Sequence, residues 1–251
     1  YYLFQNGFNE DVFQFGGSGL KNYCKDLKPD NIEDLIATNA LFRPGPIEIG
    51  AHIKYAQIKN GLKEPEYDFG LEEITSTTYS TIVYQEQIMK IVQQLGGFTL
   101  VEADDIRKAM GKKLPEVMAK YKQQFIAGAV ERHCPQLTAE NIWFKMEGFA
   151  GYAFNRSHAA CYAITGYHSQ WFKAIYPLQF WLTSLKHSSR EELQSKISEI
   201  KAIGFGISLS GPDILKSHKH YFGDIESNKI YWSLNSVAYI SDTATDEIMK
   251  L

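Results

Sequence analysis

The sequence predicts a mainly α-helical protein that ends in a small α+β segment. Through residues 1–186, apolar residues recur near helical spacing, and prolines or glycines separate one such stretch from the next. After a polar helical stretch at 189–203, residues 206–234 change to short β-type runs between turn residues. A chain of 251 residues suits one large domain or two modest ones. We therefore expect a helical main body over 1–186 and an appendage over 187–251.

Proline and glycine set the limits of the predicted helices. A short apolar segment and a glycine-rich turn precede a helix that ends before Pro29, after which Asp30 or Asn31 can cap the next helix. That helix stops at Arg43-Pro44-Gly45-Pro46, where the two prolines predict a rigid loop that holds Arg43 in place. The remaining helices are expected at 50–60, 79–94, 100–131 with breaks near Gly111 and Pro115, 138–149 with Thr138 as a possible cap, and 157–176, which is predicted to be largely buried.

Composition excludes several classes of protein. The 26 basic and 29 acidic residues leave a net charge of −3, which excludes a globally basic nucleic-acid protein of the histone kind. Cys24, Cys134 and Cys161 are scattered and odd in number, so neither a disulfide framework nor a zinc site is expected, and the reducing cytoplasm fits best. No membrane span or secretory leader is predicted. Because the chain starts without Met and in mid-pattern, we expect a segment of a longer protein.

The window 104–113 begins a concentration of positive charge. From residue 107 to 122, six basic residues against one acidic residue give a local charge of +5. Gly111 lets the backbone approach an anion closely, so the window suits phosphate, although a solvated basic helix face is the alternative that spacing alone favours. The basic residues are Arg107, Lys108, Lys112, Lys113, Lys120 and Lys122.

A second window is the turn at 148–155, which leads into the long helix. It delivers Asn155, Arg156, Ser157 and His158 to the start of that helix. The free N–H groups and positive dipole end of a helix bind anions, so these residues can form a phosphate site. The alternative is that Asn155 or Ser157 is a plain N-cap and His158 is a structural histidine.

Polar residues interrupt an apolar helical pattern in a third window, at Tyr84, Gln85, Glu86 and Gln87. These side chains can hydrogen-bond a ligand or brace the Arg43 loop. An internal polar network is the alternative that the window by itself favours.

No catalytic residue or metal ligand is predicted in the chain. Asp104 and Asp105 are neighbours, and neighbours on a helix point about 100° apart, so the two carboxylates cannot clamp two metal ions. HExxH, P-loop, GxSxG and GxGxxG motifs are absent from the sequence.

Taken together, these windows resemble the bacterial C-family replicative DNA polymerases, the DNA polymerase III alpha subunits. The resemblance covers about residues 3–215, and five motifs occur in the order of that family. They are Val12-Phe-Gln-Phe with Gly19, Asn39-Ala-Leu-Phe-Arg-Pro-Gly-Pro46, Val83-Tyr-Gln-Glu-Gln-Ile-Met89, Ala103-Asp with Arg107-Lys-Ala-Met-Gly-Lys-Lys113, and Phe149-Ala-Gly-Tyr-Ala-Phe-Asn-Arg-Ser-His158.

The resemblance implies that residues 1–186 are the fingers domain, a helical lobe that contacts the incoming deoxynucleoside triphosphate and the template. The residues that it places at the triphosphate or the template backbone are Arg43, Arg107, Lys108, Lys112, Lys113, Asn155, Arg156, Ser157 and His158. It also implies two Mg²⁺ ions on palm aspartates outside this region, so the chain alone is expected to be inactive. The implied partners are template-primer DNA, deoxynucleoside triphosphates, a sliding clamp and other replicase subunits.

The sequence departs from the family pattern at two places. Gly16-Gly17 stands where the family usually has Glu-Ser. Residues 236–241 align with a stretch that usually ends Lys-Gly-Val-Gly and begins a helix-hairpin-helix unit, and Tyr239 and Ser241 replace glycines whose N–H groups face DNA phosphates. Duplex binding by this degenerate segment is therefore in doubt. A divergent, non-catalytic paralogue that binds nucleic acid or a protein is the competing interpretation.

Overall fold

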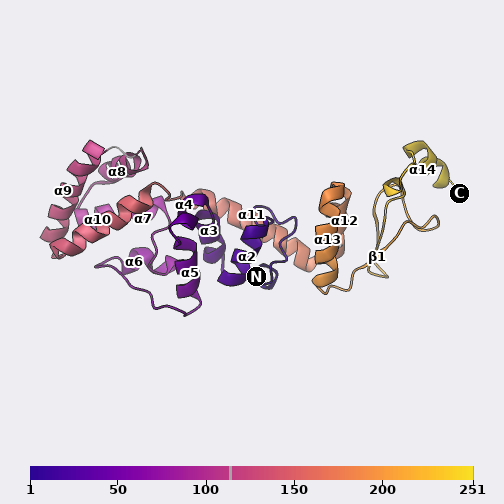
Figure 1. Ribbon diagram of the computed structural model, residues 1–251, viewed down its shortest axis with the longest axis horizontal. Coiled ribbons are helices and arrows are strands. Elements are labelled where there is room, and N and C mark those ends of the chain that lie inside the picture. The colour runs from indigo at the N-terminus through magenta and orange to yellow at the C-terminus, as the bar shows by residue number, and fades with distance from the viewer. Residues whose placement is uncertain (113–114, 251) are drawn as a thin grey trace. The chain divides into compact units, whose positions relative to one another are not determined.

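The computed structural model describes residues 1–112 and 115–250 and is mainly helical, with a small sheet near its C-terminal end, as the sequence predicts (Figure 1). The chain divides into two compact units. The first comprises Tyr1–Gly7 and Ser18–Thr165, and the second comprises Phe8–Gly17 and Gly166–Leu251. This division falls inside a long helix, whereas the sequence places a domain boundary at 186, which stays a prediction. Within the described residues, no helix is long and apolar enough to cross a bilayer.

The first unit consists of helices whose ends follow local signals. Asn31 caps α3, because its side chain accepts a hydrogen bond from the N–H of Asp34. Gly97 ends α7 in the left-handed conformation, at φ 74°. The elements of this unit are α1 (Tyr2–Gln5), α2 (Ser18–Leu27), α3 (Ile32–Leu41), α4 (Pro44–Glu48), α5 (Ala51–Lys59), α6 (Glu72–Thr75), η1 (Ser76–Thr78), α7 (Gln85–Gly96), α8 (Leu100–Lys112), α9 (Pro115–Glu131), α10 (Gln136–Ala150) and the first half of α11 (Arg156–Ile175).

A hydrophobic core of this unit lies among α7, α8, α9 and α10, which pack together in Figure 1. Phe125 of α9 and Trp143 of α10 are fully buried there, with ring centroids 5.3 Å apart. Helices α7 and α9 cross closely, because a Cβ at Gly128 would lie 2.1 Å from the carbonyl oxygen of Gly96. The backbone itself thus requires glycine at this crossing.

One predicted loop and two predicted helix starts need correction. The segment Pro44–Glu48 is the short helix α4 rather than a loop, with Arg43 as its N-cap, because proline suits the first helical turn. Helix α7 begins at Gln85 and not at residue 79, since the chain before it is extended and bonded to a distant segment. Helix α10 begins at Gln136, so Thr138 lies inside it and caps nothing.

The prediction that the long helix α11 is largely buried is wrong. Only one stripe of it, with Ala159, Ala163 and Lys173 among its residues, is buried. Trp171 is 43% exposed and Phe172 is 53% exposed. Apolar residues on several sides of a helix predict burial only if other segments cover those sides, and the described residues cover just one.

The second unit contains helices and a three-stranded sheet. Its elements are α12 (Pro177–Lys186), α13 (Arg190–Ala202), β1 (Ser208–Ser210), β2 (Phe222–Asp224), β3 (Lys229–Tyr231), η2 (Leu234–Ser236) and α14 (Asp242–Ile248). The strand order is β1-β3-β2, with β1 parallel and β2 antiparallel to β3. Trp181 and Ile230 are fully buried in a core between α12, α13 and the sheet. The predicted polar helix and β-type runs are therefore confirmed.

A buried lysine fastens segment Phe8–Gly17 within the second unit. The Nζ of Lys173 donates to the carbonyl of Phe8 at 3.1 Å and lies 2.7 Å from a carboxylate oxygen of Glu199. It also donates to the carbonyl of Glu10. Burial is the main cause that lowers the pKa of Lys173 to about 8.

The two departures from the family pattern have different backbone consequences. Gly16 and Gly17 avoid positive φ, and a Cβ would meet nothing closer than 3.4 Å at Gly16 and nothing within 4 Å at Gly17. Side chains therefore fit at both. Tyr239, by contrast, has φ 69°, the left-handed conformation that favours glycine, and its side chain is fully exposed.

Candidate nucleotide and nucleic-acid interface

A short backbone pairing brings two of the sequence windows together. The N–H of Gln85 donates to the carbonyl of Phe154 at 3.0 Å, and the N–H of Phe154 donates to the carbonyl of Val83 at 3.2 Å. The start of α7 and the turn before α11 thus run side by side, although about 70 residues separate them in sequence. The four candidate segments around this pairing all belong to the first unit.

Gln87 fixes the chain that leads into α7. Its side chain is buried, and its Oε1 accepts the N–H groups of Val83 at 2.8 Å and Tyr84 at 2.9 Å. Its Nε2 donates to Thr78 Oγ1 at 2.7 Å and to the carbonyl of Ile74 at 3.1 Å. Every polar atom of the amide is therefore used within the protein, which is the internal network that the sequence favours for this residue.

The phenol of Tyr84 lies in the same region, but its polar group is not hydrogen-bonded within the described protein as that of Gln87 is. Its ring is buried, and its hydroxyl has no hydrogen-bond partner among the described residues. Burial raises its pKa, and the negative charge of Glu33 contributes to the same shift. The group is a neutral hydroxyl at physiological pH.

Arg43 lies at the start of α4, and its side chain contacts the turn before α11. Its guanidinium carbon lies 4.0 Å from the centroid of the Phe154 ring, a cation–π contact. Gly45 lets the two segments come close, because a Cβ there would lie 1.9 Å from a ring carbon of Tyr152. The expectation that prolines hold Arg43 is thus met by a helical turn that packs on Tyr152 and Phe154.

The cationic side chains of α8 are partly neutralised by a neighbouring carboxylate. Asp104 accepts hydrogen bonds from Arg107 Nε at 2.9 Å and Nη2 at 2.8 Å, and it pairs with Lys108 at 2.7 Å. The hydrogen bond from Lys108 is the largest of the causes that lower the pKa of Asp104. Arg107 Nη1 also donates to Gln85 Oε1 at 3.3 Å, which links α8 to α7. The described part of this region is therefore less positive than the count from residue 107 suggests.

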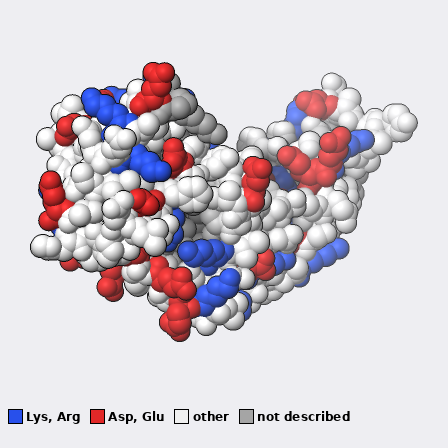
Figure 2. All heavy atoms as spheres, turned by 60° about the vertical axis from the view of Figure 1, so that its left-hand side comes forward, with Lys and Arg blue, Asp and Glu red and all other residues white. Residues whose placement is uncertain are grey.

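Lys112 and Lys113 are the other two cations of the window 104–113. Lys112 is exposed in the last turn of α8, whereas Lys113 lies outside the described residues. On the face drawn in Figure 2, acidic side chains lie among the basic ones and the basic side chains do not form a continuous surface.

A carboxylate already occupies the N-terminal end of α11. Both carboxylate oxygens of Glu86 accept the N–H of Arg156 at 3.1 Å, and one accepts Nδ2 of Asn155 at 2.9 Å. Asn155 Oδ1 in turn accepts the N–H of His158 at 2.8 Å, so Asn155 is the cap of this helix. Because a helix N-terminus binds negative charge, Glu86 stands where a phosphate would bind.

The guanidinium of Arg156 is held by a different acid. Its Nη2 lies 2.6 Å from a carboxylate oxygen of Glu33 on α3, and this hydrogen bond is the main cause that raises the pKa of Arg156. Both side chains are partly exposed, so the pair is solvated and easily exchanged.

His158 joins a column of rings that leads back to Arg43. Its imidazole meets the edge of Phe154 at 5.3 Å and stacks on Tyr162 at 4.4 Å between centroids. Ser157 lies beside it on the exposed first turn of α11. The sequence windows contain Arg43 and His158 separately, and the structure connects them through Phe154.

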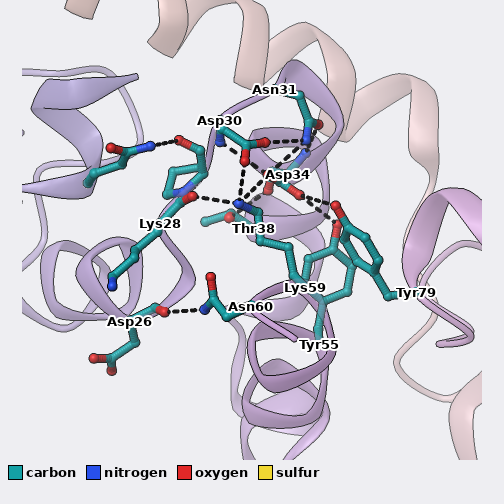
Figure 3. Close-up of polar contacts among 12 residues, drawn as sticks. Asp26, Lys28, Asp30, Asn31, Asp34, Thr38, Tyr55, Lys59, Asn60 and Tyr79 are labelled. Carbon is teal, nitrogen blue, oxygen red and sulfur yellow. Dashed lines mark hydrogen bonds and ion pairs between the residues drawn. The ribbon is translucent and has the colours of Figure 1, made fainter. Parts of the chain in front are cut away.

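A buried ion-pair network supports α3, which carries Glu33 (Figure 3). Asp34 is fully buried, and the hydroxyls of Tyr55 and Tyr79 donate to its Oδ1 at 3.3 and 3.4 Å. Lys59 reaches Asp34 at 3.5 Å and the exposed Asp30 at 2.9 Å. The sequence analysis missed Asp34, although a carboxylate on the apolar side of a predicted helix was a signal for it.

The described residues do not fit a two-metal site. Asp104 binds Arg107 and Lys108, so its oxygens are already used by cations. Within residues 1–112 and 115–250, no three His, Cys, Asp or Glu side chains come together as ligands of an ion would.

Comparisons with known proteins agree with these motifs. A family model described as the bacterial DNA polymerase III alpha subunit finger domain matches residues 1–133. The chain is 42% identical over 252 residues to the DNA polymerase III subunit alpha of Aquifex aeolicus, with the whole chain covered, and 38% identical over 246 residues to that of Borreliella burgdorferi, with 97% covered. It spans 21% of the length of each of these relatives.

The chain therefore belongs to the family of bacterial DNA polymerase III alpha subunit finger domains. The resemblance that the sequence motifs indicate is confirmed. The roles of individual residues toward nucleotide and DNA stay predictions.

Proposed function

We propose that this chain is the fingers part of a DNA-directed DNA polymerase and that it binds the incoming deoxynucleoside triphosphate and the template. The observation that supports this most is the convergence of Arg43, Arg107 and residues 155–158 around the pairing of Tyr84 with Phe154. These residues come from four separate segments. Cationic groups at one place neutralise a triphosphate during nucleotidyl transfer, as phosphoryl-transfer chemistry requires.

In this proposal, carboxylates of the protein bind the cationic groups of the site while no phosphate is bound. Glu86 accepts the N–H of Arg156, and Glu33 pairs with its guanidinium. A bound phosphate would replace these two carboxylates. Asp104 plays the same part for Arg107 and Lys108. Each exchange replaces one charge-assisted hydrogen bond by another, so the released internal contact offsets part of the free energy of phosphate binding and binding can be reversible.

The remaining parts of the function are proposals about a longer protein. The two Mg²⁺ ions of the reaction would be held by palm aspartates outside this chain, and the chain alone would not extend a primer. Template-primer DNA, a sliding clamp and other replicase subunits are the proposed partners, in the cytoplasm. Cationic Lys112 and Lys113 would add attraction for the template backbone.

The experiment measures binding of a fluorescent deoxyadenosine triphosphate to the chain, and of a labelled template-primer. Arg107→Ala and Arg156→Ala should each weaken triphosphate binding by about 10-fold. A charge-assisted contact is worth about 1.5–3 kcal/mol, and the internal carboxylate contact given up on binding brings the loss to the lower end of that range. Lys90→Ala is the matched control, since Lys90 is an exposed lysine of α7. Equal affinities for all variants would overturn the assignment of these residues.

A second experiment tests the enzyme context. The chain replaces the matching 252-residue region of the Aquifex aeolicus relative, and primer extension is measured with Mg²⁺ and all four deoxynucleotides. Extension by the chimera, with kcat/KM reduced about 10- to 100-fold by Arg107→Ala, is the expected result. A folded chimera that binds DNA but never extends a primer would favour the non-catalytic paralogue.

A further inference from the structure

A hollow between α2 and α5 of the first unit is not part of the interface described above. Its volume is about 680 Å³, within the range of about 300–1,000 Å³ that is typical of small-molecule sites. The hollow and the interface involve adjacent residues of the chain. Phe42 lines the hollow, and the next residue, Arg43, contacts Phe154 at the interface.

Aromatic rings form one wall of the hollow. Tyr23 and Phe42 are stacked at 5.4 Å between centroids, and His52 meets Tyr23 edge-on at 5.4 Å and Phe42 edge-on at 6.1 Å. The hydroxyl of Tyr23 donates to the carbonyl of His52 at 3.0 Å, which fixes the pair. Gly19 leaves room beside Phe42, since a Cβ there would lie 3.1 Å from the ring. A held, partly open stack of rings favours another flat ring.

Carboxamide side chains also line the hollow. The side-chain amides of Asn22 and Gln57 line the hollow, and neither makes a hydrogen bond to another described residue. Carboxamides of this kind pair with the edge of a purine through one donor and one acceptor.

The lining of the hollow also carries a small positive charge. Lys25, Lys28 and Asp26 line it, which gives a net charge of +1. No carboxylate within the described residues pairs with the Nζ of Lys25 or of Lys28. The stem of Lys25 lies across Gly7, where a Cβ would be 2.3 Å from its Cε. Packing against Gly7 thus positions the ammonium group of Lys25, and no described carboxylate neutralises its charge.

We propose that the hollow between α2 and α5 is a nucleotide-binding pocket. The ring of Phe42 would stack on the base and His52 would contact the base edge-on. Asn22 and Gln57 would hydrogen-bond the edge of the base, and Lys25 with Lys28 would neutralise the phosphate. A purine is favoured, because its larger ring stacks more and presents a donor next to an acceptor. The same chemistry is offered by a free mononucleotide and by one nucleotide of single-stranded DNA.

The test measures binding of adenosine 5′-monophosphate and of a four-residue oligodeoxyadenylate to the chain by isothermal titration and by NMR shift changes. Gln57→Trp fills the hollow from the half-buried face of α5 and should abolish binding. Lys25→Ser should weaken it about 10-fold, because one charge-assisted phosphate contact is lost. Lys54→Ser, another exposed lysine of α5 outside the hollow, should leave the affinity unchanged.

The experiment distinguishes a free mononucleotide from single-stranded DNA as the ligand, and the hollow from the polymerase interface as the binding site. Tighter binding of the monophosphate than of the oligonucleotide, per nucleotide, identifies a free nucleotide as the ligand, and the reverse identifies single-stranded DNA. NMR shift changes at Asn22 and Gln57 report binding in the hollow separately from binding at the interface around Phe154, so failure of the proposed polymerase site leaves this result intact. Absence of binding by both probes at millimolar concentration, or equal binding by wild type and a folded Gln57→Trp, would overturn the proposal.

Discussion

The guanidinium of Arg43 lies over the ring of Phe154, 4.0 Å from its centroid, although 111 positions separate the two residues. The contact joins the start of α4 to the turn before α11. Phe154 is itself fixed by its backbone pairing with α7. The position of Arg43 therefore depends on three segments, and changes at any of them should reach it.

Gly45→Ala should displace the start of α4. The new Cβ would lie 1.9 Å from a ring carbon of Tyr152, so we expect a loss of about 1–3 kcal/mol in the free energy of unfolding. Urea denaturation measures it. Gly45→Ala with Tyr152→Ala should lose less than the sum of the two single changes, because the clash is then relieved. Strictly additive losses would contradict the contact.

Glu86→Gln should strengthen triphosphate binding. The substitution removes the negative charge at the N-terminus of α11 but keeps an amide oxygen that can accept the N–H of Arg156. We expect an affinity about 3- to 10-fold higher in a fluorescence titration. Glu73→Gln, on the exposed surface of α6, is the control. Weaker binding by Glu86→Gln would show that the carboxylate does not compete with phosphate.

Asp34→Ala should destabilise the first unit far more than Asp30→Ala. Asp34 is fully buried and its loss leaves the buried hydroxyl of Tyr55 unpaired, which costs about 2–4 kcal/mol. Asp30 pairs with the same Lys59, but its side chain is 64% exposed, so its loss should cost less than about 1 kcal/mol. Thermal unfolding of the two variants compares them, and equal losses would contradict the buried role of Asp34.

Lys173→Met should destabilise the second unit by about 3–5 kcal/mol, because it leaves the carboxylate of Glu199 buried without its cation. Lys186→Met, at an exposed position of α12, is the matched control and should change stability by less than about 0.5 kcal/mol. Urea denaturation of both variants measures the difference. Similar stabilities would show that Lys173 is not needed to hold segment Phe8–Gly17.

The pH dependence of stability should also depend on Lys173. Its pKa is lowered from 10.5 in the unfolded chain to about 8 in the fold. Between these values the unfolded chain binds more protons at this position, so its contribution to the free energy of unfolding rises with pH. The stability of wild type minus that of Lys173→Met should therefore increase from pH 7.5 to 10. A constant or falling difference would refute the shift.

Tyr239→Gly should stabilise the segment before α14. Tyr239 adopts φ 69° with a fully exposed side chain, so glycine relieves strain and loses no packing, a gain of about 1 kcal/mol. Tyr239→Ala keeps the strain and should show no gain. Amide hydrogen exchange near residues 236–246 measures both variants, and equal protection in the two would contradict the strain.

The helix limits that the sequence predicts correctly depend on neighbouring residues. Pro29 follows the end of α2, Asn31 caps α3 and Gly97 ends α7, because caps and breakers act through backbone geometry within one turn. The starts of α7 and α10 were wrong for a different reason. The apolar spacing before Gln85 belongs to an extended segment that is bonded to Phe154, and spacing alone does not reveal such a partner.

The sequence by itself determined the mainly helical class, the small C-terminal sheet and the family, because these follow from local periodicity and from motifs in a fixed order. Only the tertiary structure decided which charges are free. Glu86 reaches the start of α11 across 70 positions, and Glu33 reaches Arg156 across 123. Electrostatic interaction depends on distance in space and on burial, so a count of charges along the chain cannot give it.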